Sequence, residues 1–213
     1  MKVTLKLATS LDGRIATASG ESRWITGPAA RRQVHRLRAA SAAIMVGVDT
    51  VIIDDPDLTV RLEDLAASQP VRVVLDSRQR IPLGSRLVTT ARDLATVVLT
   101  TDTPNKRLTD AGVTVIQVSQ RASRVDPRAA LKALAAMDHE SVLIEGGGQV
   151  AASFLVAGLV DAIEWFRSPT ILGCEGRAAV GAIGLGELAK APRFRRLAVQ
   201  GLGDDLWERY ERG

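Results

Sequence analysis

The fold is indicated most clearly by the stretch Val142-Leu143-Ile144-Glu145-Gly146-Gly147-Gly148-Gln149, in which an apolar strand runs into three glycines and then into a helix. Glycine lets the backbone approach a ligand closely, and the amides of a helix start favour a phosphate. The spacing differs from the Gly-x-Gly-x-x-Gly fingerprint of dinucleotide-binding folds. The stretch predicts a ligand-binding turn, and a tight turn that binds nothing is the alternative interpretation.

Strand and helix patterns alternate on both sides of this stretch. Alternating apolar and polar residues predict a strand at residues 3–8, and short apolar runs predict strands at 42–46, 71–75, 96–99, 113–118 and 162–166. Helices are expected to begin at Pro28, near Pro104, at Pro127 and at Gln149, while residues 47–55 are ambiguous. The alternation predicts an α/β fold with a mostly parallel sheet covered by helices on both faces, and the tail at 197–210 predicts an antiparallel edge hairpin.

The composition is that of a globular protein with a substantial core, since 46% of the 213 residues are hydrophobic and 24% are charged. No stretch rich in Pro, Gly and Ser divides the chain, so residues 1–213 are expected to form a single domain. The net charge of +4 suits an anionic small molecule. The densest basic run, Arg193-Phe194-Arg195-Arg196, lacks the clustered aromatic residues of a nucleic-acid surface and is interpreted as a solvated strand edge.

Cysteine and histidine are too few for a disulfide or a zinc site, because Cys174 is accompanied only by His35 and His139. We therefore expect no metal. The His-x-Glu and Pro-Cys-x-x-Cys signature of zinc deaminases is absent, so no deaminase domain is expected. The first residues contain no long apolar run, which predicts neither a signal peptide nor a membrane anchor and leaves the cytoplasm as the default location.

Three further places carry candidate chemistry, two of them beyond strand ends, where open α/β sheets bind ligands. In Leu75-Asp76-Ser77-Arg78, a hydroxyl and a guanidinium could hold the 2′-phosphate of NADP, although such loop residues are usually only solvated. In Asp54-Asp55-Pro56, adjacent carboxylates could act as acid or base, with a simple turn as the default interpretation. Lys6 lies inside an apolar strand, where a lysine is rarely buried without a partner, and a solvent-facing lysine is the alternative.

A series of short motifs runs from the first strand towards the final hairpin. In order, they are residues 6–16 (KLATSLDGRIA), 19–26 (SGESRWIT), 37–38 (LR), 46–51 (VGVDTV), 54–56 (DDP), 58–61 (LTVR) and 145–148 (EGGG). Each alone is unspecific, but the ordered set is highly specific. The chain resembles the reductase domain of the bacterial bifunctional riboflavin-biosynthesis deaminase–reductase, the 5-amino-6-(5-phosphoribosylamino)uracil reductase family.

The resemblance implies a dihydrofolate reductase-like, three-layer αβα fold, which agrees with the pattern of strands and helices. It implies an oxidoreductase that uses NADPH to reduce the ribosyl group of a phosphorylated aminopyrimidine to a ribityl group. Members of the family are typically dimers. We therefore expect a homodimer that binds a small-molecule substrate, with neither a nucleic acid nor a membrane as partner.

The resemblance also implies which residues bind. The cofactor contacts would be Ala8, Trp24, Thr50, Asp54, Ser77, Gly147, Gly148, Gln149, Val150, Ala151, Ala152 and Ser153. The substrate contacts would be Ser22, Arg38, Leu58, Arg61 and Glu145. Arg38 and Arg61 could grip a sugar phosphate with paired donors. Glu145 could accept hydrogen bonds from ribose hydroxyls, and Trp24 could offer a flat face to the nicotinamide, with a core tryptophan as the alternative.

The expected reaction delivers a hydride to C1′ of the ring-opened imine of an N-glycosylamine. The opened sugar oxygen or the imine nitrogen then needs a proton. Asp54 and Lys6 are the catalytic candidates, and Asp54 is preferred. A carboxylic acid in this role would have to hold a proton near neutrality, whereas Lys6 could stabilise developing charge as a cation.

Three alternatives to this function are open. In the stand-alone relatives reduction precedes deamination, so the substrate could be the 2,5-diamino-pyrimidinone precursor. Another reductase of the same fold would act on dihydrofolate or a pterin. A non-catalytic NADP-binding regulatory module is the alternative of another class, and the polar set Lys6, Asp54, Arg61 and Glu145 speaks against it.

Overall fold

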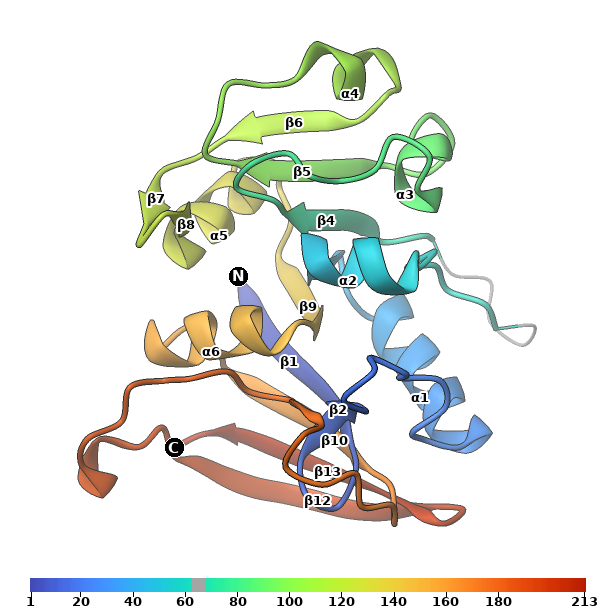
Figure 1. The fold of residues 1–213 in the computed structure, drawn as a ribbon, viewed down its shortest axis with the longest axis vertical. Coiled ribbons are helices and arrows are strands. Elements are labelled where there is room, and N and C mark those ends of the chain that lie inside the picture. Colours follow the sequence, from blue (N-terminus) through green and yellow to red (C-terminus); the bar gives the residue numbers. More distant parts are fainter. Residues whose placement is uncertain (63–67) are drawn as a thin grey trace. The chain divides into compact units, whose positions relative to one another are not determined.

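The computed structural model describes residues 1–62 and 68–213, which divide into two compact units (Figure 1). The first unit consists of Met1–Lys2 and His35–Leu143, and the second consists of Val3–Val34 and Ile144–Gly213. Three elements cross the boundary between them along the chain, β1 (Lys2–Thr9), α1 (Pro28–Ala39) and β9 (Ser141–Gly146). That residues 1–213 form a single domain stays a prediction.

The first unit contains four parallel strands in the order β3 (Ala43–Gly47), β4 (Val71–Leu75), β5 (Thr96–Thr100) and β6 (Thr114–Gln117). Each of these strands was expected from its apolar run. The ambiguous residues 47–55 form a helix, α2 (Val48–Asp54), whose Val48 and Val51 are buried. The remaining elements of the unit are α3 (Arg86–Thr89), α4 (Lys106–Asp110), β7 (Gln120–Arg121), β8 (Arg124–Val125) and α5 (Pro127–Ala135).

A hydrophobic core forms between this sheet and its helices. Its members are apolar side chains with at most 6% exposure, among them Ile44, Val46, Val51, Leu58, Val74, Leu87, Val98 and Leu108. The strands of a parallel sheet are buried on both faces, which explains why they read as continuous apolar runs rather than as alternating patterns.

The second unit contains strands in the order β12 (Phe194–Leu202), β13 (Asp205–Arg212), β10 (Ala162–Arg167) and β1 (Lys2–Thr9). β1 and β10 are parallel, whereas β13 pairs antiparallel with both β10 and β12. The predicted antiparallel edge hairpin is therefore confirmed. Its outer strand β12 begins with the basic run at residues 193–196, of which Arg193, Arg195 and Arg196 are exposed, as expected for a solvated edge.

Three short elements of the second unit escaped the sequence analysis because they are too brief to show a period. β2 (Arg14–Ala16) pairs antiparallel with β11 (Arg177–Ala178), and a single 3-10 turn spans Leu188–Lys190. Helix α6 (Gly148–Val156) was expected and follows β9 directly. Among residues 1–62 and 68–213, no helix is long and apolar enough to cross a bilayer.

Candidate functional site

The glycine turn between β9 and α6 has the geometry that the sequence predicted. Gly147 is the N-cap residue of α6 and has a φ of +86°, a conformation that side chains other than glycine rarely adopt. Gly147 offers no capping side chain, and its carbonyl accepts the first helical bond, from Ala151 N at 3.0 Å. The first amides of a helix lack acceptors within it, so this helix start fits a phosphate group.

Gly148 is a glycine for a different reason. A Cβ atom at this position would lie 2.5 Å from the carbonyl oxygen of Ala178, and Gly181 N donates to Gly148 O at 2.8 Å. The segment at residues 178–181 therefore lies directly against the turn. Gly147 is required for its backbone angle, and Gly148 is required because two backbone segments pack closely at its position.

The later part of the expected cofactor run packs into the protein. Ala151 and Ala152 are 2% and 3% exposed, and Ser153 Oγ donates to the carbonyl of Val150 at 2.8 Å. The backbone amides without acceptors inside the helix are therefore those of the first turn of α6. Contacts of Ala151, Ala152 and Ser153 with a cofactor stay predictions.

Lys6 and Glu145 form an ion pair in the second unit. The Nζ of Lys6 lies 3.7 Å from Oε2 of Glu145, and the two side chains are only 13% and 5% exposed. The alternative of a solvent-facing lysine is therefore wrong. Glu145 lies on β9 two residues before the N-cap of α6, whereas Lys6 lies on β1. The ion pair therefore joins β1 to the strand-turn-helix segment that carries the glycine turn. Ala8 lies two positions along β1 and pairs with Phe166 of β10.

Trp24 is exposed rather than part of a core. Its residue exposure is 71%, and the guanidinium of Arg31 lies 4.4 Å from the centroid of the indole ring. Arg31 is itself held by a hydrogen bond from Nη1 to Thr26 O at 2.6 Å. An exposed indole stacked on a fixed cation is free to contact a ligand with its other surface. Ser22, two residues earlier, is half-buried.

Helix α2 and the segment that follows it contain a further set of expected site residues in the first unit. Thr50 and Asp54 are half-buried on α2, and Asp54 is its last residue. Asp55 and Leu58 both have positive φ angles, +40° and +52°. The side chain of Leu58 is buried in the hydrophobic core, so a contact with substrate would have to use its backbone.

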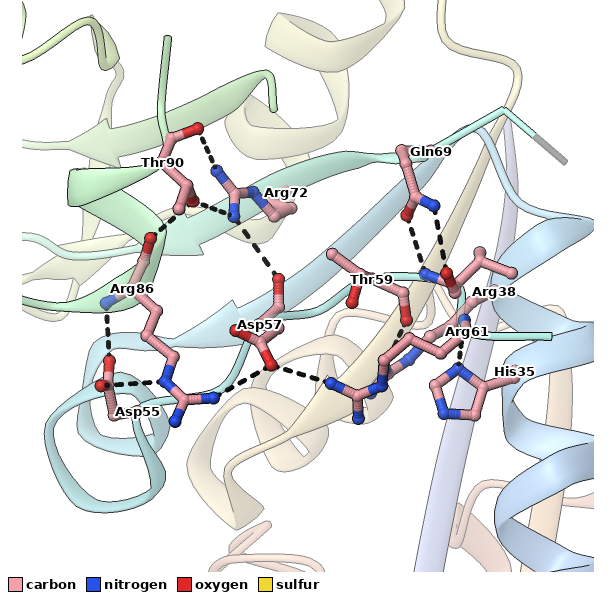
Figure 2. Close-up of polar contacts among 11 residues, drawn as sticks. His35, Arg38, Asp55, Asp57, Thr59, Arg61, Gln69, Arg72, Arg86 and Thr90 are labelled. Atoms are coloured by element: carbon pink, nitrogen blue, oxygen red, sulfur yellow. Dashed lines mark hydrogen bonds and ion pairs between the residues drawn. The ribbon is translucent and has the colours of Figure 1, made fainter. Parts of the chain in front are cut away.

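Side chains from other parts of the first unit hold this segment in place by hydrogen bonds (Figure 2). Arg38 Nη1 donates to Thr59 O at 2.9 Å, and Arg61 N donates to Nδ1 of His35 at 3.2 Å. The side-chain amide of Gln69 bonds both the N–H and the carbonyl of Val60, at 2.8 and 3.1 Å. The backbone that carries Arg61 is therefore fixed by side chains of α1 and by Gln69, which lies two residues before β4.

The Arg61 guanidinium is held by a carboxylate that the sequence analysis did not single out. Asp57 Oδ2 accepts hydrogen bonds from Arg61 Nη1 at 2.8 Å and from Arg86 Nη1 at 3.1 Å (Figure 2). Asp55 Oδ1 accepts from Arg86 N at 2.8 Å. Asp55 and Asp57 flank Pro56, and no local pattern indicates that both would meet an arginine 31 and 29 residues away.

Ser77 follows β4 at the strand end, as expected. Its Oγ accepts a hydrogen bond from Val125 N at 3.0 Å, and its carbonyl accepts from Thr101 N at 3.2 Å. A hydroxyl that accepts one bond can still donate its own proton to an anionic oxygen. Ser77 therefore remains a candidate for a 2′-phosphate contact.

Comparison with known proteins identifies the family. Residues 1–207 match the family model described as the RibD C-terminal domain. The chain belongs to this family. The expected resemblance to reductases of riboflavin biosynthesis is thereby confirmed.

Three relatives illustrate the match. RibD of Actinobacillus pleuropneumoniae is 37% identical over 208 residues, which cover 96% of this chain and 55% of that protein. A second relative comes from Methanothermobacter thermautotrophicus and is named 2,5-diamino-6-ribosylamino-4(3H)-pyrimidinone 5′-phosphate reductase. It is 38% identical to this chain over an alignment that covers 98% of this chain and 96% of that protein. The structure of Acinetobacter baumannii RibD, form 2, superposes with a TM-score of 0.89 at 36% identity, covering 100% of this chain and 58% of that one.

These relatives confirm the α/β architecture with a parallel sheet, antiparallel edge strands and a dihydrofolate reductase-like fold. The chain spans a little over half the length of the RibD proteins it matches. Relatives named as pyrimidine phosphate reductases place the chain in an oxidoreductase family, which implies a nicotinamide cofactor.

Proposed function

We propose that this protein uses NADPH to reduce the ribosyl group of 5-amino-6-(5-phosphoribosylamino)uracil to the ribitylamino product, a step of riboflavin biosynthesis. The observation that carries the proposal is the largely buried ion pair between Lys6 on β1 and Glu145 on β9, the strand that leads into the glycine turn. A charged pair beside a phosphate-binding helix start suits a reaction in which charge develops next to a dinucleotide.

Each unit, taken by itself, offers groups that suit parts of NADPH. In the second unit, the uncapped start of α6 at Gly148 suits a phosphate and the exposed indole of Trp24 suits a flat ring. In the first unit, the Ser77 hydroxyl suits a 2′-phosphate. When bound, NADPH supplies the hydride that reduces C1′ of the ring-opened sugar. The choice of NADPH over NADH rests on Ser77 and on the family.

The protein's own residues would bind and protonate the substrate. Arg38 and Arg61 supply cations for the sugar phosphate, and Arg61 is already fixed by His35 and Asp57. Glu145 accepts hydrogen bonds from the sugar, as does Ser22, and Leu58 contributes backbone groups. Asp54 is the preferred proton donor, and Lys6 could instead stabilise negative charge on the opened sugar oxygen as a cation.

The proposed assembly is a cytoplasmic homodimer. Strand β12 is the outermost strand of the second unit's sheet, and its Leu197 and Val199 are 47% and 48% exposed. An exposed edge strand with apolar side chains is a ready surface for a second copy. Size-exclusion chromatography with light scattering tests this, and Leu197→Lys with Val199→Lys should give a monomer if the edge is the interface.

Consumption of NADPH in the presence of single substrates tests the function. The expected result is turnover with the ribosylaminouracil phosphate, with its 2,5-diamino-pyrimidinone precursor as the alternative substrate. Turnover with dihydrofolate alone would overturn the proposal in favour of a pterin reductase. Tight NADPH binding without turnover of any substrate would instead indicate a regulatory binding module.

Two substitutions then separate the proton-donor candidates. Asp54→Asn should lower kcat strongly if Asp54 donates the proton, and Lys6→Met should do so if Lys6 stabilises the developing charge. An Asp54→Asn variant with unchanged kcat would remove Asp54 from the mechanism.

A further inference from the structure

Arg31 on α1 contacts the exposed indole of Trp24 directly. The guanidinium carbon of Arg31 lies 4.4 Å from the centroid of the Trp24 ring, and Trp24 is 71% exposed. A cation over an aromatic ring at this distance is attracted by the quadrupole of the ring, so the contact restrains the indole. Neither the sequence motifs nor the proposed reaction assign Arg31 a role.

The Arg31 guanidinium is itself held by the loop that carries the indole. Its Nη1 donates a hydrogen bond to the carbonyl oxygen of Thr26 at 2.6 Å. A guanidinium has several N–H donors in one rigid plane, so it can bond a carbonyl with its edge while it stacks on an aromatic ring with its face. Because Thr26 lies two residues after Trp24, Arg31 links the indole to the backbone of its own loop.

A buried carboxylate, Asp205, anchors the end of this loop. Asp205 is 4% exposed, and its Oδ2 accepts a hydrogen bond from Gly27 N at 2.6 Å. Gly27 O in turn accepts from Arg31 N at 3.1 Å, the first backbone hydrogen bond of α1. Asp205 is the first residue of β13, so the edge hairpin fixes the helix start that carries Arg31. Trp24, Gly27, Arg31 and Asp205 all belong to the second unit.

We propose that Arg31 is a positioning residue for Trp24: it orders the indole for contact with the nicotinamide ring of NADPH. This inference rests on the proposed function, in which Trp24 contacts the cofactor. An exposed side chain that moves freely loses conformational freedom when a ligand orders it, and that loss weakens binding. Because the contact with Arg31 restrains the ring before the cofactor arrives, less freedom is lost on binding.

A double-mutant cycle, read by titration with NADPH, tests whether Arg31 acts through Trp24. Arg31→Met should raise the Kd of NADPH about threefold, the effect of losing one exposed cation–π contact. In a Trp24→Ala background the same substitution should leave the Kd unchanged, because the ring that Arg31 holds is gone. Arg31→Lys keeps the charge without the planar guanidinium and should recover part of the loss.

Arg32→Met is the matched control for Arg31→Met. It removes the same charge from the next residue of α1, which is exposed and lies about 100° further around the helix axis. The Kd of NADPH should not change in this variant. The comparison separates the contact with the indole from the general attraction between a basic helix and an anionic cofactor.

Quenching of tryptophan fluorescence by acrylamide gives a second readout, which needs no cofactor. Each variant is compared with its Trp24→Phe counterpart, so that the difference isolates Trp24 from Trp165 and Trp207. Arg31→Met should raise the quenching constant of Trp24 about twofold, because the guanidinium no longer covers the ring. Arg32→Met should leave this constant unchanged.

The outcomes separate this inference from the proposed function. Absence of NADPH binding by the unaltered protein would overturn the proposed function, while quenching would still decide whether Arg31 holds the indole. An equal rise in Kd from Arg31→Met with and without Trp24 would overturn the positioning role, because Arg31 would then contact the cofactor itself. Unchanged Kd and quenching in Arg31→Met would overturn it as well. If Arg31→Met does not fold, Arg31→Lys takes its place in the cycle, with a smaller rise in Kd expected.

Discussion

Asp57 holds Arg61 in place through a hydrogen bond of 2.8 Å between its Oδ2 and Nη1 of the arginine. The same oxygen also binds Arg86, so one carboxylate orients two guanidinium groups that would otherwise repel each other. Both arginine side chains are largely exposed, at 61% and 60%. A fixed but accessible guanidinium is suited to receive an anionic substrate.

Asp57→Asn should therefore raise the KM of a phosphorylated substrate without changing kcat. Exposed ion pairs contribute about 0–1 kcal/mol, so the expected increase is about fivefold at most. Arg61→Ala, which removes the cation itself, should raise KM further. Steady-state kinetics check this, with Asp110→Asn as control because Asp110 forms an exposed ion pair with Lys106 at the same sequence spacing. A fall in kcat with unchanged KM would contradict the prediction.

Arg72 should be a major contributor to stability. It is 1% exposed on β4 and donates hydrogen bonds to Leu94 O at 2.7 Å, Thr90 Oγ1 at 2.8 Å and Leu87 O at 3.2 Å. Burial lowers the pKa of Arg72, while the nearby Asp57 raises it. Arg72→Met should reduce the free energy of unfolding by about 3–5 kcal/mol, because it leaves buried carbonyls without donors.

Urea unfolding measures this effect of Arg72. Arg92→Met is the control, since Arg92 is exposed and donates one hydrogen bond, to Asp110 O at 2.8 Å. The control should lose less than about 1 kcal/mol. Equal losses of unfolding free energy in the two variants would show that the buried contacts of Arg72 contribute nothing to stability.

Gly148→Ala should destabilise the turn and weaken NADPH binding. The added Cβ would lie 2.5 Å from Ala178 O, a backbone atom that cannot rotate away. Such overpacking costs about 1–3 kcal/mol, and the displaced start of α6 should bind a phosphate less well. Thermal unfolding and NADPH titration check both effects. Gly84→Ala should change neither, because a Cβ at Gly84 would meet nothing within 4 Å.

Asp12 should make the protein's stability depend on acid pH. A hydrogen bond from Ser10 Oγ, followed by those from the amides of Leu172 and Gly173, lowers the pKa of Asp12 to about 2. The unfolded value is about 3.9, so the stabilisation is fully present above about pH 4 and is lost as the pH falls towards 2. Asp12→Asn should flatten this part of the Tm profile, which thermal unfolding between about pH 2 and pH 5 measures; a profile unchanged by the substitution would contradict the prediction.

Local patterns were sufficient for most of the sheet. The valine-rich run at residues 71–75 coincides with β4, and the predicted glycine turn does lie between β9 and α6. Apolar runs and glycines report on burial and backbone angle at their own positions, which is why a single sequence reveals them. Residues 47–55 stayed ambiguous because a seven-residue helix such as α2 is too short to show its period.

The partners of individual polar side chains were decided by the tertiary structure alone. Nothing near Lys6 in the sequence indicates that Glu145 would lie beside it, and nothing near Asp57 indicates Arg86. The sequence by itself determined the α/β class, the glycine turn and the family motifs, because these depend on local composition and order. Strand register and loop packing bring together charges that are far apart along the chain, and those contacts determine which polar residues are buried, paired and oriented.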